Sequence, residues 1–120
     1  MKRIAVFASG SGSNAENFIN YFRQNDAADI SLVLSDNKSA KVLQRAEKHG
    51  VPHAVFTKEE LACGKVLEKL KRNKIDFIVL AGFLRLVPAD IINSYQGRIV
   101  NIHPAMFNQL RHSPNRRTCW

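Results

Sequence analysis

The strongest constraint on the fold of this chain is the regular alternation of short apolar runs with segments whose apolar residues recur at helical spacing. Five runs have the length of a strand: Ile4–Ala8, Ile30–Leu34, Val51–Phe56, Phe77–Ala81 and Arg98–His103. The first, second and fourth are almost uniformly apolar, which is typical of strands buried on both faces. Because strands that alternate with helices form parallel sheets, the sequence predicts an α/β fold: a Rossmann-like open parallel sheet with helices on both faces.

The segments between these runs carry signals for helix ends. Gly50 stands where the second helix is expected to end. The pattern Thr57-Lys58-Glu59-Glu60 is a capping box that opens a third helix, and Pro88 is expected to begin a fourth that runs through Tyr95. The expected apolar stripes are Ala15, Phe18, Ile19 and Phe22 in the first helix, Val42, Leu43 and Ala46 in the second, and Cys63, Val66, Leu67 and Leu70 in the third.

Composition places the chain among globular proteins of one domain. Apolar residues make up 45% of the 120 residues, and no apolar stretch approaches the ~20 residues of a membrane span. The apolar run after the basic start is too short for a secretory signal, so we expect a buried first strand, a cytoplasmic location and no membrane partner. Cys63 and Cys119 match no metal-binding spacing, which favours free thiols.

The net charge of +8 is not gathered into one basic patch. Most charges are scattered over expected helix faces, which is typical of solvated surface, so no nucleic-acid partner is expected. A mild positive field would still favour capture of a phosphorylated metabolite. Residues 106–120 contain three arginines, no acid and no regular periodicity. We therefore expect one domain over residues 1–105, followed by a tail over 106–120 that is either disordered or encoded by a shifted reading frame.

The loop Gly10-Ser11-Gly12-Ser13-Asn14 follows the first strand and precedes the first helix. Glycines allow a tight turn and a close approach to a ligand, and a helix start offers free N–H groups to an anion. The loop lacks the lysine of a P-loop, so triphosphate binding is not expected. Two interpretations stay open: a phosphate site, or a bare turn in which Ser13 or Asn14 caps the helix.

Asn101 and His103 lie two residues apart at the end of the fifth strand, so they project to the same side, and Ile102 is turned away. Pro104 cannot continue a central strand, which places His103 at the carboxyl edge of the sheet, where α/β proteins bind ligands. An amide and an imidazole there can hold an oxyanion and move a proton. The alternative is that His103 is a hydrogen-bonded histidine at the end of the strand, with Asn101 in a turn, and that neither residue takes part in catalysis.

The loop after the fourth strand, Gly82–Pro88, is rich in apolar residues. It either walls a flat aromatic ligand or packs into the core. Asp36 follows the second strand, where a Rossmann enzyme can hold a ribose, but the glycine fingerprint is lacking. No metal site is expected, because the remaining histidines are isolated from acids and thiols; they are His49, His53 and His112.

Three segments together resemble the phosphoribosylglycinamide formyltransferase family of purine synthesis. They are Ile4-Ala5-Val6-Phe7-Ala8-Ser9-Gly10-Ser11-Gly12-Ser13-Asn14, Asp76–Arg85 and Gly97–Ala105. The Asn-Ile-His-Pro segment is shared by other enzymes that use 10-formyltetrahydrofolate, whereas the Gly-Ser-Gly-Ser-Asn loop is more selective. The resemblance covers residues 1–105.

That resemblance implies two small-molecule partners, glycinamide ribonucleotide and 10-formyltetrahydrofolate, the latter as formyl-donor cosubstrate, with no metal. It implies that Asn101 hydrogen-bonds the formyl oxygen and that His103 is the general acid for transfer to the glycinamide amine. The residues implied for the substrate phosphate are Gly12, Ser13 and Asn14. The residues implied for the folate pocket are Leu84, Arg85, Leu86, Val87 and Asn101.

The sequence departs from the family pattern after Ala105, and Asp90 is the last acid in the chain. The aspartate that accompanies the histidine in the family therefore has no counterpart here. We expect little formyltransferase activity from this chain. The alternatives are a non-catalytic fragment that binds phosphorylated metabolites, or another 10-formyltetrahydrofolate enzyme such as methionyl-tRNA formyltransferase or formyltetrahydrofolate deformylase.

Overall fold

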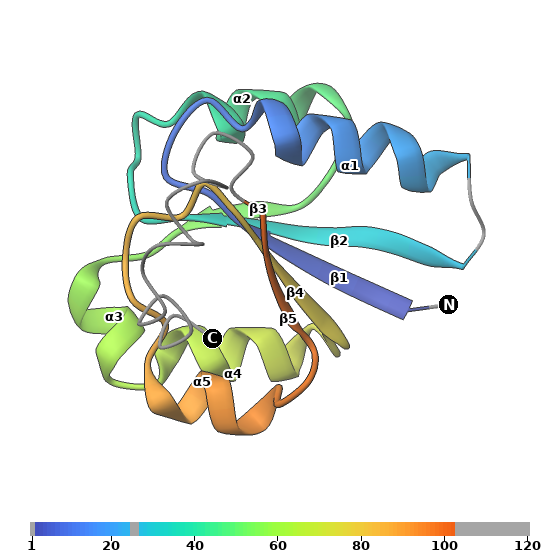
Figure 1. The fold of residues 1–120 in the computed structure, drawn as a ribbon. Helices are drawn as coiled ribbons and strands as arrows, with labels where there is room; N and C mark the ends of the chain where they lie inside the picture. The colour runs from blue at the N-terminus through green and yellow to red at the C-terminus, as the bar shows by residue number, and fades with distance from the viewer. Residues whose placement is uncertain (1, 25–26, 103–120) are drawn as a thin grey trace, which may run out of the picture.

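The computed structural model describes residues 2–24 and 27–102, and its centre is a sheet of five strands (Figure 1). Every neighbouring pair of strands is parallel, and their order is β3-β2-β1-β4-β5. The predicted open parallel sheet is confirmed, although His103 of the fifth run lies outside the described residues. The strands are β1 (Lys2–Phe7), β2 (Ala28–Ser35), β3 (His53–Val55), β4 (Phe77–Ala81) and β5 (Ile99–Ile102).

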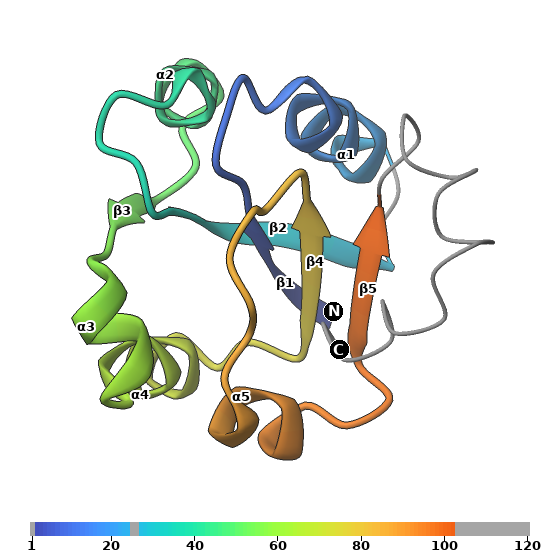
Figure 2. The same ribbon diagram turned by 60° about the vertical axis from the view of Figure 1, so that its left-hand side comes forward.

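Helices cover both faces of the sheet, as predicted (Figure 2). One face carries α1 (Ser13–Arg23) and α2 (Lys41–Lys48), and the other carries α3 (Lys58–Ala62), α4 (Lys65–Arg72) and α5 (Ala89–Ser94). The longest of them, α1, has 11 residues. Within the described ranges, no helix is long and apolar enough to cross a membrane.

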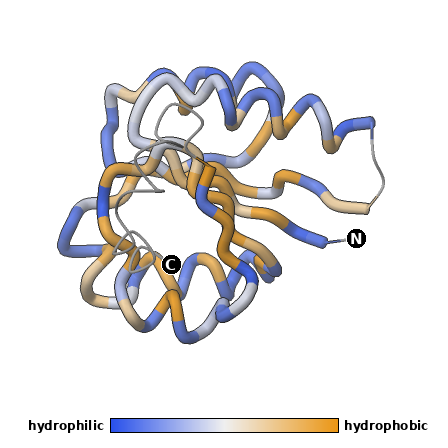
Figure 3. The backbone as a smooth tube through the Cα atoms, in the orientation of Figure 1, coloured by the Kyte–Doolittle hydropathy of each residue, from blue (hydrophilic) through white to orange (hydrophobic). Residues whose placement is uncertain are grey.

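The side chains of β1 divide between two apolar cores, because successive residues of a strand point to opposite faces. Ala5 and Phe7 pack toward α3, α4 and α5, whereas Ile4 and Val6 pack toward α1 and α2. Phe7 meets Phe83 edge-on with ring centroids 5.3 Å apart. Figure 3 shows the apolar residues concentrated along the strands, with polar residues on the outer parts of α1 and α2. Burial on both faces explains why β1, β2 and β4 read as nearly continuous apolar runs.

The expected third helix is divided into two, which corrects the sequence prediction. Its capping box is confirmed: the Thr57 Oγ1 atom accepts the Glu60 N–H at 3.1 Å, and the Glu60 carboxylate accepts the Thr57 N–H at 2.8 Å. The helix ends before Cys63, and α4 begins after Gly64, whose φ of 91° is left-handed. Cys63 is therefore an exposed free thiol and not part of an apolar stripe.

The face of β4 and β5 beside α1 carries an apolar groove of about 340 Å³. Phe18 and Phe22 of α1 form one side of it, and Val100 and Ile102 of β5 form the other. Val100 is 49% exposed, which is unusual for a valine in a parallel sheet.

Candidate functional site

The carboxyl ends of β1 and β4 form a topological switch point. The two strands are neighbours, but the chain leaves β1 toward β2 and leaves β4 toward β5, in the opposite direction. The loops that follow them, residues 8–12 and 82–88, therefore diverge (Figure 2). In open α/β sheets, ligands bind in the crevice outside such a point.

Ser9 ties these two diverging loops together. Its N–H donates to the Gly82 carbonyl at 3.3 Å, and its Oγ atom accepts the Leu84 N–H at 3.0 Å. The side chain is buried, so both bonds are shielded from water. Ser9 therefore fixes the position of the 82–88 loop relative to the glycine loop.

The start of α1 is an open set of backbone donors. Gly12 is the N-cap residue, with a φ of 72°, and no side chain caps the helix. The alternative in which Ser13 or Asn14 acts as the cap is therefore wrong: both lie inside the first turn of the helix. In the described part of the chain, no acceptor bonds the N–H groups of Gly12, Ser13 or Asn14. Free donors and the positive end of the helix dipole together favour an anion at this position.

Gly12 is required by the contact between α1 and α2, a reason that the sequence does not reveal. A Cβ atom at Gly12 would lie 2.8 Å from the Val42 Cα atom and closer still to the Val42 side chain. Val42 is buried in the core, so it cannot move aside. A larger residue at position 12 would thus disturb the fold before it obstructed a ligand.

Glu16 joins α1 to α2 through a network of charged groups. Its carboxylate accepts hydrogen bonds from the Arg45 guanidinium and, at 2.8 Å, from the Nε2 atom of His49, and the Lys48 Nζ atom lies 3.6 Å away. The hydrogen bond from His49 lowers the pKa of Glu16 below its usual 4.5; burial opposes this shift, and Arg45 and Lys48 reinforce it. Glu16 is thus held as a carboxylate directly behind the glycine loop.

The loop after β4 presents leucines to solvent. Leu84 is 81% exposed and Leu86 is 68% exposed. They line a cleft of about 340 Å³, together with residues of α3 and with Pro88. Phe83 and Val87 are buried in the core beneath them, so Val87 does not line the cleft. The two leucines provide an apolar ledge with room for a flat ligand.

Arg85 and Asp36 form an ion pair that links this loop to the end of β2, with the Arg85 Nε atom 2.9 Å from the Asp36 Oδ2 atom. The Asp36 side chain is only 10% exposed. Its other oxygen, Oδ1, is buried and has no hydrogen-bond partner within the described residues. The ion pair thus connects the 82–88 loop to the end of β2.

Asn101 lies in β5 opposite Leu80 of β4, near the carboxyl edge of the sheet. Ile99 packs toward α5 and Ile102 packs toward α1, so the alternation of the strand places Asn101 on the side of α5 and the 82–88 loop. Its buried Oδ1 atom has no partner in the described ranges. His103 lies outside the described residues, so its position relative to Asn101 stays a prediction.

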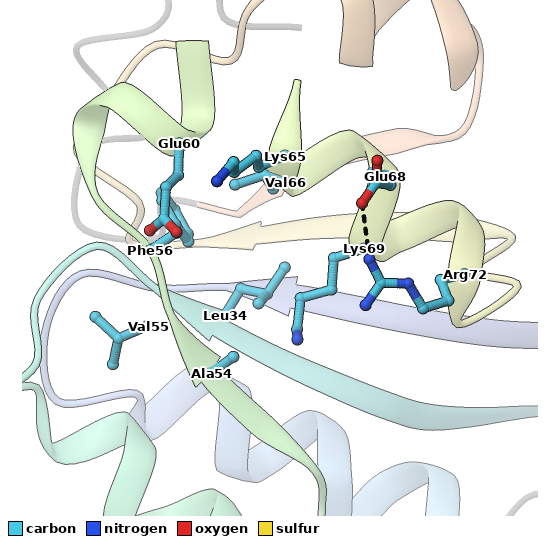
Figure 4. A pocket seen from close by; sticks show the side chains of 10 residues that line it. All are labelled: Leu34, Ala54, Val55, Phe56, Glu60, Lys65, Val66, Glu68, Lys69 and Arg72. Atoms are coloured by element: carbon cyan, nitrogen blue, oxygen red, sulfur yellow. Dashed lines mark hydrogen bonds and ion pairs between the residues drawn. The ribbon is translucent and has the colours of Figure 1, made fainter. Parts of the chain in front are cut away.

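Metal ligands and a second cleft were also sought among the described residues. The described residues contain no group of three or more His, Cys, Asp or Glu side chains that could hold a metal ion. A second cleft lies between β3 and α4, where the Arg72 guanidinium pairs with Glu68 at 2.8 Å (Figure 4). None of the site residues predicted from the sequence lines that cleft.

The fold and the site define an open α/β protein with a topological switch point, the place where proteins of this class bind ligands. A family model described as formyl transferase matches residues 2–111 of the chain. The chain therefore belongs to the formyl transferase family.

Named relatives agree with this assignment. The chain is 37% identical over 112 residues to phosphoribosylglycinamide formyltransferase of Bacillus subtilis, a match that covers 88% of this chain and 57% of the relative. It is 38% identical over 113 residues to the trifunctional purine biosynthetic protein adenosine-3 of Drosophila melanogaster, covering 88% of this chain and 8% of that protein.

Solved structures show the same fold. Glycinamide ribonucleotide transformylase 1 of Geobacillus kaustophilus superimposes with a TM-score of 0.80 at 40% identity, over 87% of this chain and 58% of that one. Phosphoribosylglycinamide formyltransferase of Bacillus halodurans gives a TM-score of 0.77 at 35% identity, over 96% and 66% of the two chains. The chain thus spans somewhat more than half the length of the bacterial relatives that it matches.

Proposed function

We propose that this chain binds glycinamide ribonucleotide and 10-formyltetrahydrofolate in the cytoplasm and serves the transfer of a formyl group to the glycinamide amine in purine synthesis. The observation that carries the proposal is the pairing of two unlike surfaces at one switch point. Free backbone N–H groups lie at the start of α1, and the exposed side chains of Leu84 and Leu86 lie on the 82–88 loop. Ser9, just before the glycine loop, hydrogen-bonds to the 82–88 loop and so joins the two surfaces. A phosphorylated substrate and a flat cosubstrate need these two surfaces side by side.

The phosphate is assigned to the start of α1. The N–H groups of Gly12, Ser13 and Asn14 supply donors, and the exposed Ser13 side chain supplies a hydroxyl. No lysine or arginine is needed for this contact, because backbone donors at a helix start already favour an anion.

The folate is assigned to the cleft over Leu84 and Leu86. The cleft is mainly apolar and holds about 340 Å³, which suits part of a flat ring system. Arg85 stands at its rim, held by Asp36, and Val87 supports the loop from below. The bound cosubstrate would supply the formyl carbon.

Asn101 is the residue of the described chain that we assign to the oxyanion. It lies on the same side of the sheet as the leucine ledge, and its amide can donate to a developing negative charge. His103 is assigned to the proton that the reaction must move, as the family resemblance implies.

A charge placed at the start of α1 separates ligand binding from folding. Ser13→Asp should leave the helix as stable or more stable, by about 0.3–1 kcal/mol, because an acid in the first turn suits the dipole. The same charge should repel a phosphate by about 1–4 kcal/mol at ~4 Å, so glycinamide ribonucleotide should bind at least several-fold more weakly. Asn20→Asp, which is exposed further along α1, makes the same charge change as a control.

Isothermal calorimetry with glycinamide ribonucleotide and with 10-formyltetrahydrofolate checks both surfaces. The expected result is weaker binding of the ribonucleotide by Ser13→Asp alone, with folate binding unchanged. Equal affinity of Ser13→Asp and Asn20→Asp for the ribonucleotide would remove the phosphate site from α1. Binding of both ligands without turnover would assign the chain to ligand capture alone.

A further inference from the structure

Three successive carbonyl groups of the glycine loop, those of Gly10, Ser11 and Gly12, accept hydrogen bonds from α1 and α2. The Gly10 carbonyl accepts the N–H of Val42 at 3.2 Å, and the Gly12 carbonyl accepts the N–H of Glu16 at 2.8 Å. Between them, the Ser11 carbonyl accepts the Nε–H of Arg45 at 2.6 Å. The first and third bonds come from helix backbones, whereas the middle one depends on a single side chain.

These bonds decide where the loop's donors point. In a planar trans peptide, the carbonyl of one residue and the N–H of the next point in opposite directions. With the carbonyls of residues 10–12 directed toward α1 and α2, the N–H groups of Ser11, Gly12 and Ser13 are directed away from those helices. The loop thus presents successive donors on its outer side, as an anion-binding backbone does.

Arg45 is itself held in place. Its Nη1 atom donates to Glu16, and Glu16 is bonded in turn to His49. The Arg45 side chain is partly buried, with 33% of its surface exposed, and its guanidinium uses Nε for the loop and Nη1 for the carboxylate. A lysine at position 45 would keep the positive charge but could not make both bonds with one fixed planar group.

We propose that Arg45 is a positioning residue for the phosphate site: it holds the Ser11 carbonyl inward so that the neighbouring N–H groups face the phosphate of the ligand. This inference rests on the proposed function, since it presumes that the loop binds a phosphate. Arg45 acts through the loop and needs no contact with the ligand.

The test compares Arg45→Lys with a control, Arg72→Lys. Arg72 pairs with Glu68 on α4 and is far from the glycine loop in the sequence. Both variants keep the charge and lose one guanidinium. Each is titrated by calorimetry with glycinamide ribonucleotide, inorganic phosphate and 10-formyltetrahydrofolate. Arg45→Lys should bind both phosphate ligands about 5- to 10-fold more weakly, as expected for one net hydrogen bond, and should bind the folate unchanged. Arg72→Lys should match the parent chain throughout.

The pattern across ligands separates positioning from general damage to the fold. A loss of folate and phosphate binding together would show that Arg45 only supports the structure, and equal phosphate binding by Arg45→Lys and the parent would also overturn its role. A parent chain that binds no phosphate ligand would refute the proposed function itself. As a milder second variant, Glu16→Gln leaves Arg45 in place but weakens its anchor, so its loss of phosphate affinity should be smaller than that of Arg45→Lys.

Discussion

Replacing Gly12 with alanine should destabilise the fold by more than the backbone conformation of that residue requires. Gly12 has a φ of 72°, and a Cβ atom there would lie 2.8 Å from the Val42 Cα atom. Gly97 has almost the same φ, 73°, but a Cβ atom there would meet nothing within 4 Å. The two positions therefore share the cost of a left-handed conformation and differ in the steric conflict.

The expected magnitudes follow from these two terms. A left-handed conformation costs an ordinary residue roughly 1–2 kcal/mol, and an overpacked core adds roughly 1–3 kcal/mol. Gly97→Ala should thus lose about 1–2 kcal/mol, and Gly12→Ala about 2–5 kcal/mol. Gly10→Ala, with open space around it and no left-handed φ, should be close to neutral.

Urea denaturation of the parent and the three variants measures the differences. With a slope of roughly 2 kcal/mol per molar urea, an additional loss of 2 kcal/mol lowers the midpoint of Gly12→Ala by about 1 M relative to Gly97→Ala. If Gly12→Ala and Gly97→Ala lost the same free energy of unfolding, the contact with Val42 would not be the reason for glycine at position 12.

Three further predictions concern charge, association and catalysis. The pKa of Glu16 is lowered, so its ion pairs stabilise the fold above the ordinary pKa of 4.5, and this stabilisation is lost as the pH falls through the lowered value. The urea midpoint of Glu16→Gln should therefore lie below that of the parent at about pH 7, and the difference should shrink as the pH is lowered below 4.5; a difference that stays constant with pH would contradict this. Val100 on β5 is exposed and should promote self-association of the chain through this strand at the edge of the sheet. Val100→Lys should therefore lower the average mass measured by sedimentation; a parent chain that is already monomeric would argue against this. The formyl-transfer rate of the 120-residue polypeptide with the two proposed substrates should be below about 1 s⁻¹, because the printed sequence has no carboxylate after His103 to orient the imidazole. A higher rate that is lost in His103→Ala would show that the site is complete.

Hydrophobic periodicity was enough to predict the sheet and its two layers of helices. The runs that became β1, β2 and β4 are almost uniformly apolar because helices cover both faces of the sheet; the buried Ser31 of β2 is an exception. The capping box at Thr57 involves neighbouring residues only. The division between α3 and α4 was missed, because a glycine inside a helical pattern is tolerated in some surroundings and breaks the helix in others. At Gly64, the left-handed φ decides the matter, and periodicity cannot reveal it.

The loops of the candidate site could be predicted from the sequence, but the residues that hold those loops in place could not. The glycine loop and the apolar 82–88 loop are each continuous in sequence, so local patterns mark them. Arg45 lies 34 residues from the carbonyl that it holds, on a helix whose charge pattern looks like ordinary surface. The same is true of Ser9, whose hydroxyl bonds a backbone N–H 75 residues later. Such contacts depend on how the elements pack, which a single sequence does not specify.

The central place of β1 also governs the order in which this fold can be assembled. β1 is made first, yet it lies between β2 and β4, and its Ile4 pairs on one side with Ile30 and on the other with Phe77. Closing the longer of these two loops costs roughly 4 kcal/mol in chain entropy, whereas the shorter costs roughly 3. The β1–β2 pair can therefore form early in synthesis, and one edge of β1 stays open until β4 emerges. During that interval, the nascent chain presents an unpaired apolar strand that chaperones or neighbouring chains can bind.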